Sequence, residues 1–528
     1  MGVNIKIPLN ITKQTTSHEL HGGLYFAINN SAALSEPIKT ISLPKRLILP
    51  LQQHKGSAAV PLVKIGDSVL KGQLIADTQE EMSIRLHAPT SGKIFAIEDC
   101  AVSHPLGLIT PCMIIEPDGA EQWITRTPIT NFTAFSATEI FEKIHKAGIV
   151  GLGGAAFPTA VKLNSCANNP LQTLIINAIE CEPYICCDEA LIREHAHGII
   201  AGIRILQHAL NVKNCFIALA DNKPEAYHAL KLALQENKTT NIELKIIPAR
   251  YPSGDEKQLI KALTGLEIPH DDLPAAFGLM CHNVATVYAI HRAIEHNEPL
   301  ISRVVTVCGD GIRQAHNIDV LFGTPIEHLI MHCGGYQQNI YQLIMGGPMM
   351  GFALTSDELP VIKSTNCILV YTSDLEIESV GEKSCIRCGA CEQVCPVNLL
   401  PQQLYWHAKT QDFAKAESQH LFDCIECGCC SYVCPSEIPL VQYYRFAKTE
   451  ITQINYNHQK SNIARARFEA RQARLDAEER IKQEMLQQKK QALETQKTTS
   501  LGAQVDIQAA LARVNAKKKI AFQNDETE

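Results

Sequence analysis

Hydrophobic and polar positions follow different patterns in successive parts of the chain. Between residues 57 and 97, short apolar runs are separated by glycine, proline and serine, which indicates short strands joined by tight turns. Further along, Ile140, Ile144 and Ala147 fall on one face of a predicted helix, and residues 174–178 have the composition of a buried strand. The pattern therefore predicts a small β module followed by an α/β domain.

Later segments have their own patterns. Residues 301–351 alternate short strands with glycine turns and add a helix after Thr324 and Pro325. Between the cysteine-rich runs, a spacer helix is expected to pack through Trp406. Beyond about residue 457 the chain is rich in Ala, Arg, Glu, Lys and Gln, and its apolar residues form no heptad seam. We expect a solvated single helix or a disordered tether there; a role of its basic residues at a membrane surface is an alternative.

Cysteines carry the most specific signal. The spacing C-x2-C-x2-C-x3-C-P occurs twice, at 385–396 and at 424–435. Three thiolates of each copy can surround one cubane cluster, whereas the fourth reaches the other cluster. Cys429 lies outside the pattern. The predicted ligands are Cys385, Cys388, Cys391 and Cys434 for a first [4Fe-4S] cluster, and Cys424, Cys427, Cys430 and Cys395 for a second.

Composition narrows the class of protein. Paired C-x2-C units can also bind zinc, but eight cysteines in two identical runs exceed the four ligands of a zinc site.

The 528-residue chain has a formal net charge of −7, which does not suggest a nucleic-acid-binding protein. The other cysteines form no disulfide framework, so we expect a reducing cytosol. We see neither a signal peptide nor an apolar run long enough to span a membrane.

A glycine-rich loop follows the first predicted helix. Gly151, Gly153 and Gly154 can present backbone amides, and Lys162 lies on the helix that follows. Bare amides, a helix start and a cation together can hold a phosphate group. The loop also matches the dinucleotide-binding fingerprint G-x-G-x-x-A, but that fingerprint requires a preceding strand and here a helix precedes. We therefore reject a Rossmann domain.

Polar residues gather at the ends of three further segments. The first set follows the strand at 174–178, where amide and carboxylate side chains suit the hydroxyl groups of a ribityl chain or ribose. Such residues can equally cap the next helix, and both interpretations stay open. The other two sets stand at loop-to-helix junctions. The candidates are Asn177, Glu180 and Glu182; Asp255 and Glu256; and Asn283 and Thr286.

These segments together resemble a known family. They are similar to the flavin- and NADH-binding subunit of respiratory complex I, and more closely to the C subunit of the Rnf/Rsx ion-translocating electron transport complex. The resemblance covers about residues 20–445 and implies a multidomain α/β and α+β fold. The expected domains are a barrel-sandwich module (1–130), a flavin- and NADH-binding-like domain (131–300), a β-grasp soluble-ligand-binding domain (301–375), a ferredoxin-type two-cluster domain (376–445) and a charged helical or disordered tail (446–528).

Three positions depart from the patterns of related proteins. Ala156 stands where the complex I relatives have glycine, and its methyl group can crowd a phosphate or a flavin edge. Asp255 replaces the first glutamate of their Gly-Glu-Glu phrase. In the β module, Glu81 occupies the place of the lysine that biotinyl and lipoyl domains modify, so no covalent attachment is expected.

The resemblance also implies a function. It implies a peripheral, translocase-type oxidoreductase subunit at the cytoplasmic face of the bacterial inner membrane, which passes electrons between NAD(H) and membrane partners through FMN and two [4Fe-4S] clusters. The glycine-loop amides and Lys162 would hold the FMN phosphate, while Asn177, Glu180 and Glu182 would fix the ribityl chain and nucleotide pocket. Asp255, Glu256, Asn283 and Thr286 would close the site.

Its partners would be the other subunits of the complex and ferredoxin-like electron carriers. Two alternatives remain. The chain could be a soluble flavin and iron–sulfur reductase, such as a cobalamin reductase, or a non-catalytic adaptor whose pocket no longer binds flavin.

Overall fold

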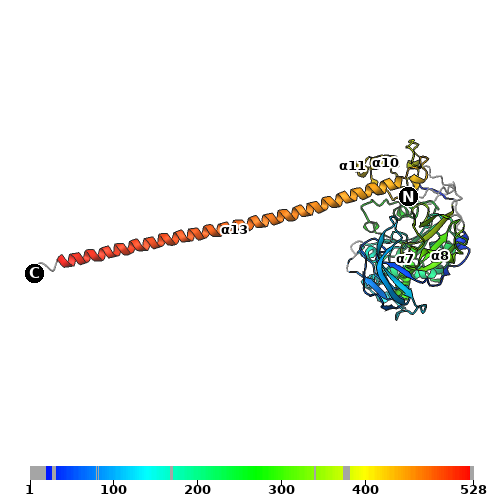
Figure 1. Cartoon of the computed structure of the whole chain (residues 1–528), viewed down its shortest axis with the longest axis horizontal. Helices are drawn as coiled ribbons and strands as arrows, with labels where there is room; N and C mark the ends of the chain where they lie inside the picture. Colours follow the sequence, from blue (N-terminus) through cyan, green and yellow to red (C-terminus); the bar gives the residue numbers. More distant parts are fainter. Residues whose placement is uncertain are drawn as a thin grey trace. The chain divides into compact units, whose positions relative to one another are not determined.

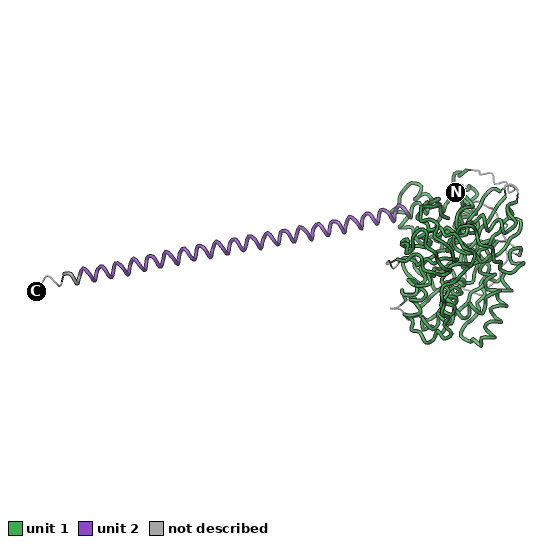
Figure 2. Tube along the Cα trace, turned by 60° about the horizontal axis from the view of Figure 1, so that its bottom comes forward, with its two compact units in different colours: residues 1–448 green, residues 449–528 purple. Residues whose placement is uncertain are grey.

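The computed structural model describes residues 20–26, 31–78, 80, 82–166, 170–337, 340–372 and 381–523 of the 528-residue chain. Glu81 lies outside these residues. Internal contacts divide the chain into two units, residues 1–448 and residues 449–528, which Figure 2 colours separately.

The N-terminal part of the first unit is a β module of two small sheets. One sheet has the order β2-β8-β7-β4 and the other β3-β5-β6. Their inward side chains, among them Leu47, Ile75 and Met113, are fully buried. The strands are β2 Leu47–Pro50, β3 Val60–Pro61, β4 Ser68–Val69, β5 Leu74–Asp77, β6 Leu86–His87, β7 Gly92–Ala101 and β8 Ile109–Pro117.

An α/β domain follows, built on a parallel sheet in the order β11-β10-β9-β12. Alternate residues of each strand face opposite sides: Leu174 packs with α4 and α7, whereas Ile175 packs with α6. The sheet comprises β9 Thr173–Ala178, β10 Asn214–Ala220, β11 Ile242–Ile247 and β12 Leu279–Asn283. Its helices are η1 Phe132–Ala134, α2 Ala137–Lys146, α3 Thr159–Asn164, α4 Cys187–Leu210, α5 Pro224–Glu236, α6 Glu256–Thr264, η2 Pro274–Phe277 and α7 Val284–Glu295.

Several sequence-based expectations are confirmed in this domain. Ile140 and Ile144 are buried on α2, and β9 covers the predicted strand at 174–178. Helix α2, and not a strand, precedes the glycine loop, which agrees with the rejection of a Rossmann domain.

The third part is a mixed sheet in the order β1-β14-β13-β17-β15-β16, in which β1 comes from the N-terminal region. The predicted helix after Pro325 is α8, Ile326–His332, which is labelled in Figure 1. The other elements are α1 Ser31–Leu34, β1 Lys39–Thr40, β13 Ser302–Cys308, β14 His316–Leu321, β15 Ile340–Met345, β16 Phe352–Ala353 and β17 Cys367–Thr372.

A buried lysine joins these three parts. Lys363, which follows the mixed sheet's β16, donates a hydrogen bond to the carbonyl of Gly148 in the α/β domain (2.7 Å) and one to the carbonyl of Arg85 in the β module (3.4 Å). Burial lowers the pKa of Lys363 to about 7. The lysine is therefore held by backbone carbonyls at the junction of three modules.

The cysteine runs lie among short helices, and one long helix ends the chain. Trp406 is 42% exposed, so the expectation that it anchors the spacer is wrong; the buried residues of that helix are Pro401, Leu404, Tyr405 and Ala408. The spacer breaks into two helices at Gln411. The elements are α9 Ala390–Gln393, α10 Pro401–Lys409, α11 Phe413–Ser418, η3 Leu421–Asp423, α12 Cys429–Tyr432 and α13 Leu440–Gln523.

The tail is helical, which agrees with the expectation of a solvated single helix. Figure 1 shows α13 as one continuous helix. Between residues 452 and 519 its side chains are exposed except for Ala477, which is half-buried.

Candidate functional site

The glycine loop leaves several amides free. The amide of Gly151 donates to the carbonyl of Phe157 (2.8 Å), and that of Leu152 donates to the hydroxyl of Thr286 (2.9 Å). The amides at positions 153–156 make no hydrogen bond with another residue in the described part of the chain. Gly154 has a φ of +110° and nothing lies within 4 Å of the place where a Cβ would stand. Free donors beside open space suit an anion.

Ala156 is accommodated at the end of this loop. It has a φ of +46° and is buried as part of the hydrophobic core, so its methyl group has a packed place in the domain. Its carbonyl accepts a hydrogen bond from the amide of Lys55 in the β module (3.3 Å). The β module therefore contacts the glycine loop directly.

Asn283 and Thr286 lie against the same loop. The side-chain oxygen of Asn283 accepts from the amides of Ala285 (2.9 Å) and Thr286 (3.4 Å), which makes it the N-cap of α7. Its amide group donates to Asp188 (2.6 Å). A Cβ added at Gly153 would lie 3.3 Å from the Cβ of Asn283, so the loop and the cap are in close contact.

Glu180 lies at the start of α4. Its carboxylate accepts from the amides of Asp188 (2.8 Å) and Glu189 (3.2 Å) and from the ammonium group of Lys223 (3.0 Å). Although burial acts in the opposite direction, Glu180 and Glu189 raise the pKa of Lys223 above its usual range. Burial, helped by the charge of Glu180, raises the pKa of Asp188 to about 7. Glu180 thus has the helix-capping contacts that the sequence left open; its role toward a ligand stays a prediction.

Lys162 and Glu256 form an ion pair across the domain. The ammonium group of Lys162 is 2.8 Å from Glu256 and donates to the carbonyl of Cys281 (2.7 Å). Asp255 is the N-cap of α6 and accepts from the amides of Lys257 and Gln258 (both 3.1 Å).

Asn177 connects the parallel sheet to the loop before α6, because its side chain donates to the carbonyl of Gly254 (2.8 Å). The predicted residues other than Glu182 therefore lie on connected segments around the glycine loop and the carboxyl ends of β9 and β12.

The side chain of Glu182 contacts the mixed sheet and not the segments around the glycine loop. Its carboxylate accepts from the amides of Met349 (2.7 Å) and Met350 (3.1 Å) in the loop between β15 and β16. Burial raises the pKa of Glu182 to about 7, in spite of these two donors. A Cβ at Gly347 would lie 2.1 Å from the Cγ of Glu182, so this glycine is needed for the approach of the two loops. Glu182 joins the α/β domain to the mixed sheet.

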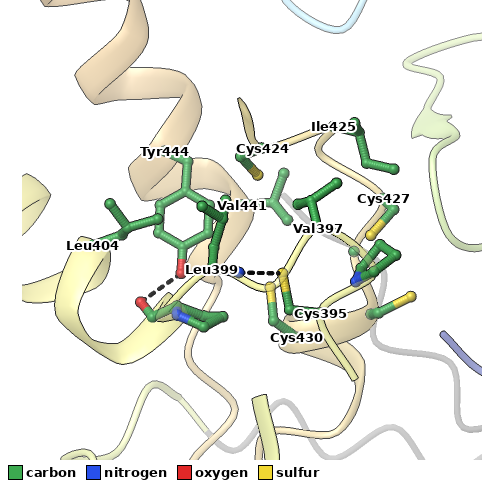
Figure 3. A pocket seen from close by; sticks show the side chains of 14 residues that line it. Cys395, Val397, Leu399, Leu404, Cys424, Ile425, Cys427, Cys430, Val441 and Tyr444 are labelled. Carbon is green, nitrogen blue, oxygen red and sulfur yellow. Dashed lines mark hydrogen bonds between the residues drawn. The ribbon is translucent and has the colours of Figure 1, made fainter. Parts of the chain in front are cut away.

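Four of the predicted cluster ligands line one cavity, which we call the second cavity. Cys395, Cys424, Cys427 and Cys430 surround it, together with Leu404, Val441 and Tyr444 (Figure 3). Cys429 lines the same cavity and is fully buried. The amide of Leu399 donates to the sulfur of Cys395 (3.3 Å).

The other four predicted ligands line the first cavity. Cys385, Cys388, Cys391 and Cys434 surround it, with Gln402 and Tyr405 in its wall. In both cavities three of the predicted ligands come from one run and the fourth comes from the other. Four predicted ligands around each cavity suit a [4Fe-4S] cluster; the ligand assignment itself stays a prediction.

Some residues of this region gave no signal in the sequence. Asp188, Lys223 and the 346–351 loop contact predicted residues, but they come from other elements and match no motif. A separate cavity of about 470 Å³ lies between α4, α7 and β13, and none of the predicted cofactor residues lines it.

Comparison with family models gives four matches in chain order. They are an RnfC barrel sandwich hybrid domain at 18–120, a Nuo51 FMN-binding domain at 144–292, an SLBB domain at 304–353 and a 4Fe-4S dicluster domain at 384–438.

Curated relatives extend over most of the chain. The C subunit of an ion-translocating oxidoreductase complex from Serratia proteamaculans is 45% identical over 502 residues, which are 95% of this chain and 70% of that protein. The chain belongs to this family of C subunits. A second member, from Vibrio cholerae, is 47% identical over 516 residues, or 97% of this chain and 66% of that protein. The chain thus spans about two thirds of the length of these two relatives.

A solved NAD⁺-reducing [NiFe]-hydrogenase also aligns, with 19% identity, over 54% of this chain and 55% of that one. Its TM-score of 0.41 is too low to support an argument about fold. Across the described residues, none of the helices has the length and apolarity needed to span a lipid bilayer.

Proposed function

We propose that this C subunit passes electrons between NAD(H) and the other subunits of a membrane-bound ion-translocating oxidoreductase, through FMN and two [4Fe-4S] clusters. One observation carries the proposal: the same unit holds a glycine loop with free amides and two cavities that are each lined by four of the predicted cluster ligands. Family membership and the match to an FMN-binding domain support it.

The residues present fit a flavin mononucleotide. The amides at 153–156 would hold its phosphate, and Asn177 and Glu180 lie at the strand end where ribityl hydroxyl groups would bind. Lys162 would add a positive charge, although Glu256 already balances part of it. Bound FMN would supply exchange of a hydride with NAD(H) and of single electrons with iron–sulfur clusters.

The surroundings of the two cavities suggest the order of electron transfer. The chain around the second cavity touches the α/β domain, where the ring of Phe422 stacks on that of His270 with centroids 6.1 Å apart. It also touches the mixed sheet, where Gly428 approaches the carbonyl of Met349. Around the first cavity, Cys388 is exposed and Ile386 is 67% exposed. The second cluster would therefore face the flavin, and the first would face a partner.

The partners we propose are the remaining subunits of the complex and one-electron carriers of the ferredoxin type. The place we propose is the cytoplasmic side of the bacterial inner membrane, since NAD(H) is a cytoplasmic substrate. Attachment there would depend on the other subunits.

A spectrum of the anaerobically purified full chain tests this function. We expect a flavin band that bleaches on addition of NADH before the broad iron–sulfur absorption does. Clusters without flavin and without a response to NADH would instead identify a non-catalytic adaptor. A pull-down from membranes before and after a high-salt wash would name the partners.

A further inference from the structure

A short N-terminal segment lies between the α/β domain and the second cavity. We call residues 21–26 the strap. The amide of Gly23 donates to the carbonyl of Val394 (2.8 Å), next to the cluster ligand Cys395. The amide of Leu24 donates to the carbonyl of Tyr251, and the amide of Tyr251 donates back to the carbonyl of Leu24 (both 2.8 Å). The strap therefore bridges a cluster-binding turn and the α/β domain through backbone hydrogen bonds.

At its two glycines the strap passes through a space too narrow for a side chain. At Gly22, which has a φ of +58°, a Cβ would lie 2.5 Å from the carbonyl oxygen of Cys395. At Gly23, with a φ of +75°, a Cβ would lie 2.6 Å from the carbonyl oxygen of Tyr251. Both positions need glycine for its backbone conformation and for the close approach.

Tyr251 makes the second connection. Its side chain is 2% exposed, and its hydroxyl donates a 2.6 Å hydrogen bond to the carbonyl of the predicted ligand Cys427. The ring of Phe26 from the strap lies 6.0 Å from the ring of Tyr251 and 5.5 Å from that of Tyr432. Because the phenol is buried in low dielectric, this hydrogen bond is stronger than an exposed one.

A continuous path joins the predicted nucleotide site to the second cavity. Asn177 donates to the carbonyl of Gly254 (2.8 Å), two residues of backbone separate Gly254 from Tyr251, and the phenol of Tyr251 donates to the carbonyl of Cys427 (2.6 Å). The first cavity has no such link to the α/β domain in the described chain; the hydrogen bonds around it include those that join Lys383 and Ser384 to Ser436.

We propose that Tyr251 and the two strap glycines are positioning residues for electron transfer between the flavin and the second cluster. The proposal rests on the function proposed above. The strap fixes the separation between the flavin-binding domain and the cluster, on which the tunnelling rate of a single electron depends steeply. NADH supplies the electron pair, and the oxidised cluster accepts one electron at a time. The phenol dipole faces the cluster turn and stabilises the reduced cluster, which carries one more negative charge.

Tyr251→Phe in the anaerobic full chain tests the phenol. Both clusters are titrated with dithionite and followed by electron paramagnetic resonance. We expect the iron content of the parent, a lower midpoint potential for one cluster and an unchanged potential for the other. Two unchanged potentials, or two equal shifts, would overturn the role of Tyr251, because a purely packing residue is replaced well by phenylalanine.

Matched glycine variants test the strap. Gly22→Ala and Gly23→Ala are compared with Gly107→Ala (φ +60°) and Gly119→Ala (φ +76°), where a Cβ would meet nothing within 4 Å. These controls impose the same backbone strain without the contact. In single-turnover reduction by NADH, we expect flavin reduction at the parent rate in all four variants and cluster reduction slowed several-fold only in the strap variants.

The outcomes separate the two proposals. Equal cluster reduction in strap and control variants would overturn the positioning role. Loss of iron from Gly22→Ala but not from Gly107→Ala would support it, since Gly22 lies against a ligand of the second cluster. If the parent chain itself shows no flavin response to NADH, the proposed function fails, whereas the dithionite titration of Tyr251→Phe still reports on the second cluster.

Discussion

The two cysteine-lined cavities have the same ligand spacing but different surroundings. The second cavity is enclosed by apolar side chains such as Leu404 and Tyr444, each 1% exposed, and it is tied to the α/β domain by the buried phenol of Tyr251. The first cavity opens to the surface at Cys388. It is supported by Glu382, which accepts from Tyr405 (2.7 Å), Tyr443 (2.9 Å) and Lys409 (3.0 Å).

Under the proposed function, this difference lets one repeated motif serve two positions in an electron path. Identical thiolate sets provide the same chemistry, whereas the neighbours decide whether a cluster faces another domain or a partner protein. Two carboxylates mark the contrast. Glu182, on the side of the second cavity, is buried and its pKa is raised, while the pKa of Glu382, near the first cavity, is lowered.

The largest expected effect is loss of a whole cluster. Cys430→Ala removes a predicted ligand of the second cluster, so we expect about half of the iron and sulfide of the parent chain. Cys429→Ala, in the same cavity wall, should keep both clusters. Anaerobic iron and sulfide analysis measures both; parental iron in Cys430→Ala would refute the assignment.

Double variants sharpen the assignment to each cavity. Cys395 and Cys430 line the second cavity although they belong to different runs, whereas Cys391 lines the first. Cys395→Ala combined with Cys430→Ala should lose no more iron than either single change. Cys391→Ala combined with Cys430→Ala should lose nearly all of it. Additive loss in the first pair would mean that each run binds its own cluster.

Glu182→Gln should change how stability depends on pH. Because burial raises the pKa of Glu182 from 4.5 to about 7, the folded chain binds an extra proton between these values. The glutamate therefore favours folding at acid pH, and this contribution is lost as the pH rises through 7. We expect the variant to equal the parent near pH 4.5 and to exceed it by at most about 3 kcal/mol at pH 8.

Denaturant unfolding at the two pH values measures this difference. The same pH dependence in parent and variant would contradict it.

Glu382→Gln should have the smallest effect, with the opposite pH dependence. Although slight burial acts against them, hydrogen bonds from Tyr405, Lys409 and Tyr443 lower the pKa of Glu382. Its contribution to stability is present above the usual glutamate pKa and is lost as the pH falls through the lowered value.

We expect a small decrease in melting temperature at pH 7, which disappears in acid and shrinks at high salt. Arg445, on the exposed start of α13, forms an ion pair with Glu426 outside the first cavity. This ion pair serves as a control for the effect of salt on the melting temperature. A decrease for Glu382→Gln that is insensitive to salt would contradict this account.

The sequence by itself determined the features that depend on local spacing. Helix α2 followed from a hydrophobic period of 3.6 residues and strand β9 from a continuous apolar run, and the predicted set of cluster thiolates followed from the cysteine spacing. The glycine loop was recognisable from its three glycines, and the helix that precedes it was visible in the hydrophobic pattern. The exposed tail followed from its composition.

Tertiary structure decided the contacts between distant segments. Glu182 meets Met349 across 167 residues, and Tyr251 meets Cys427 across 176. Trp406 is exposed because the packing of its helix buries Tyr405 instead. No periodicity or motif encodes such pairs, since each depends on how separately folded modules dock. The chain's local patterns thus specify the chemistry of each site, and the docking of modules sets the neighbours that each site acts upon.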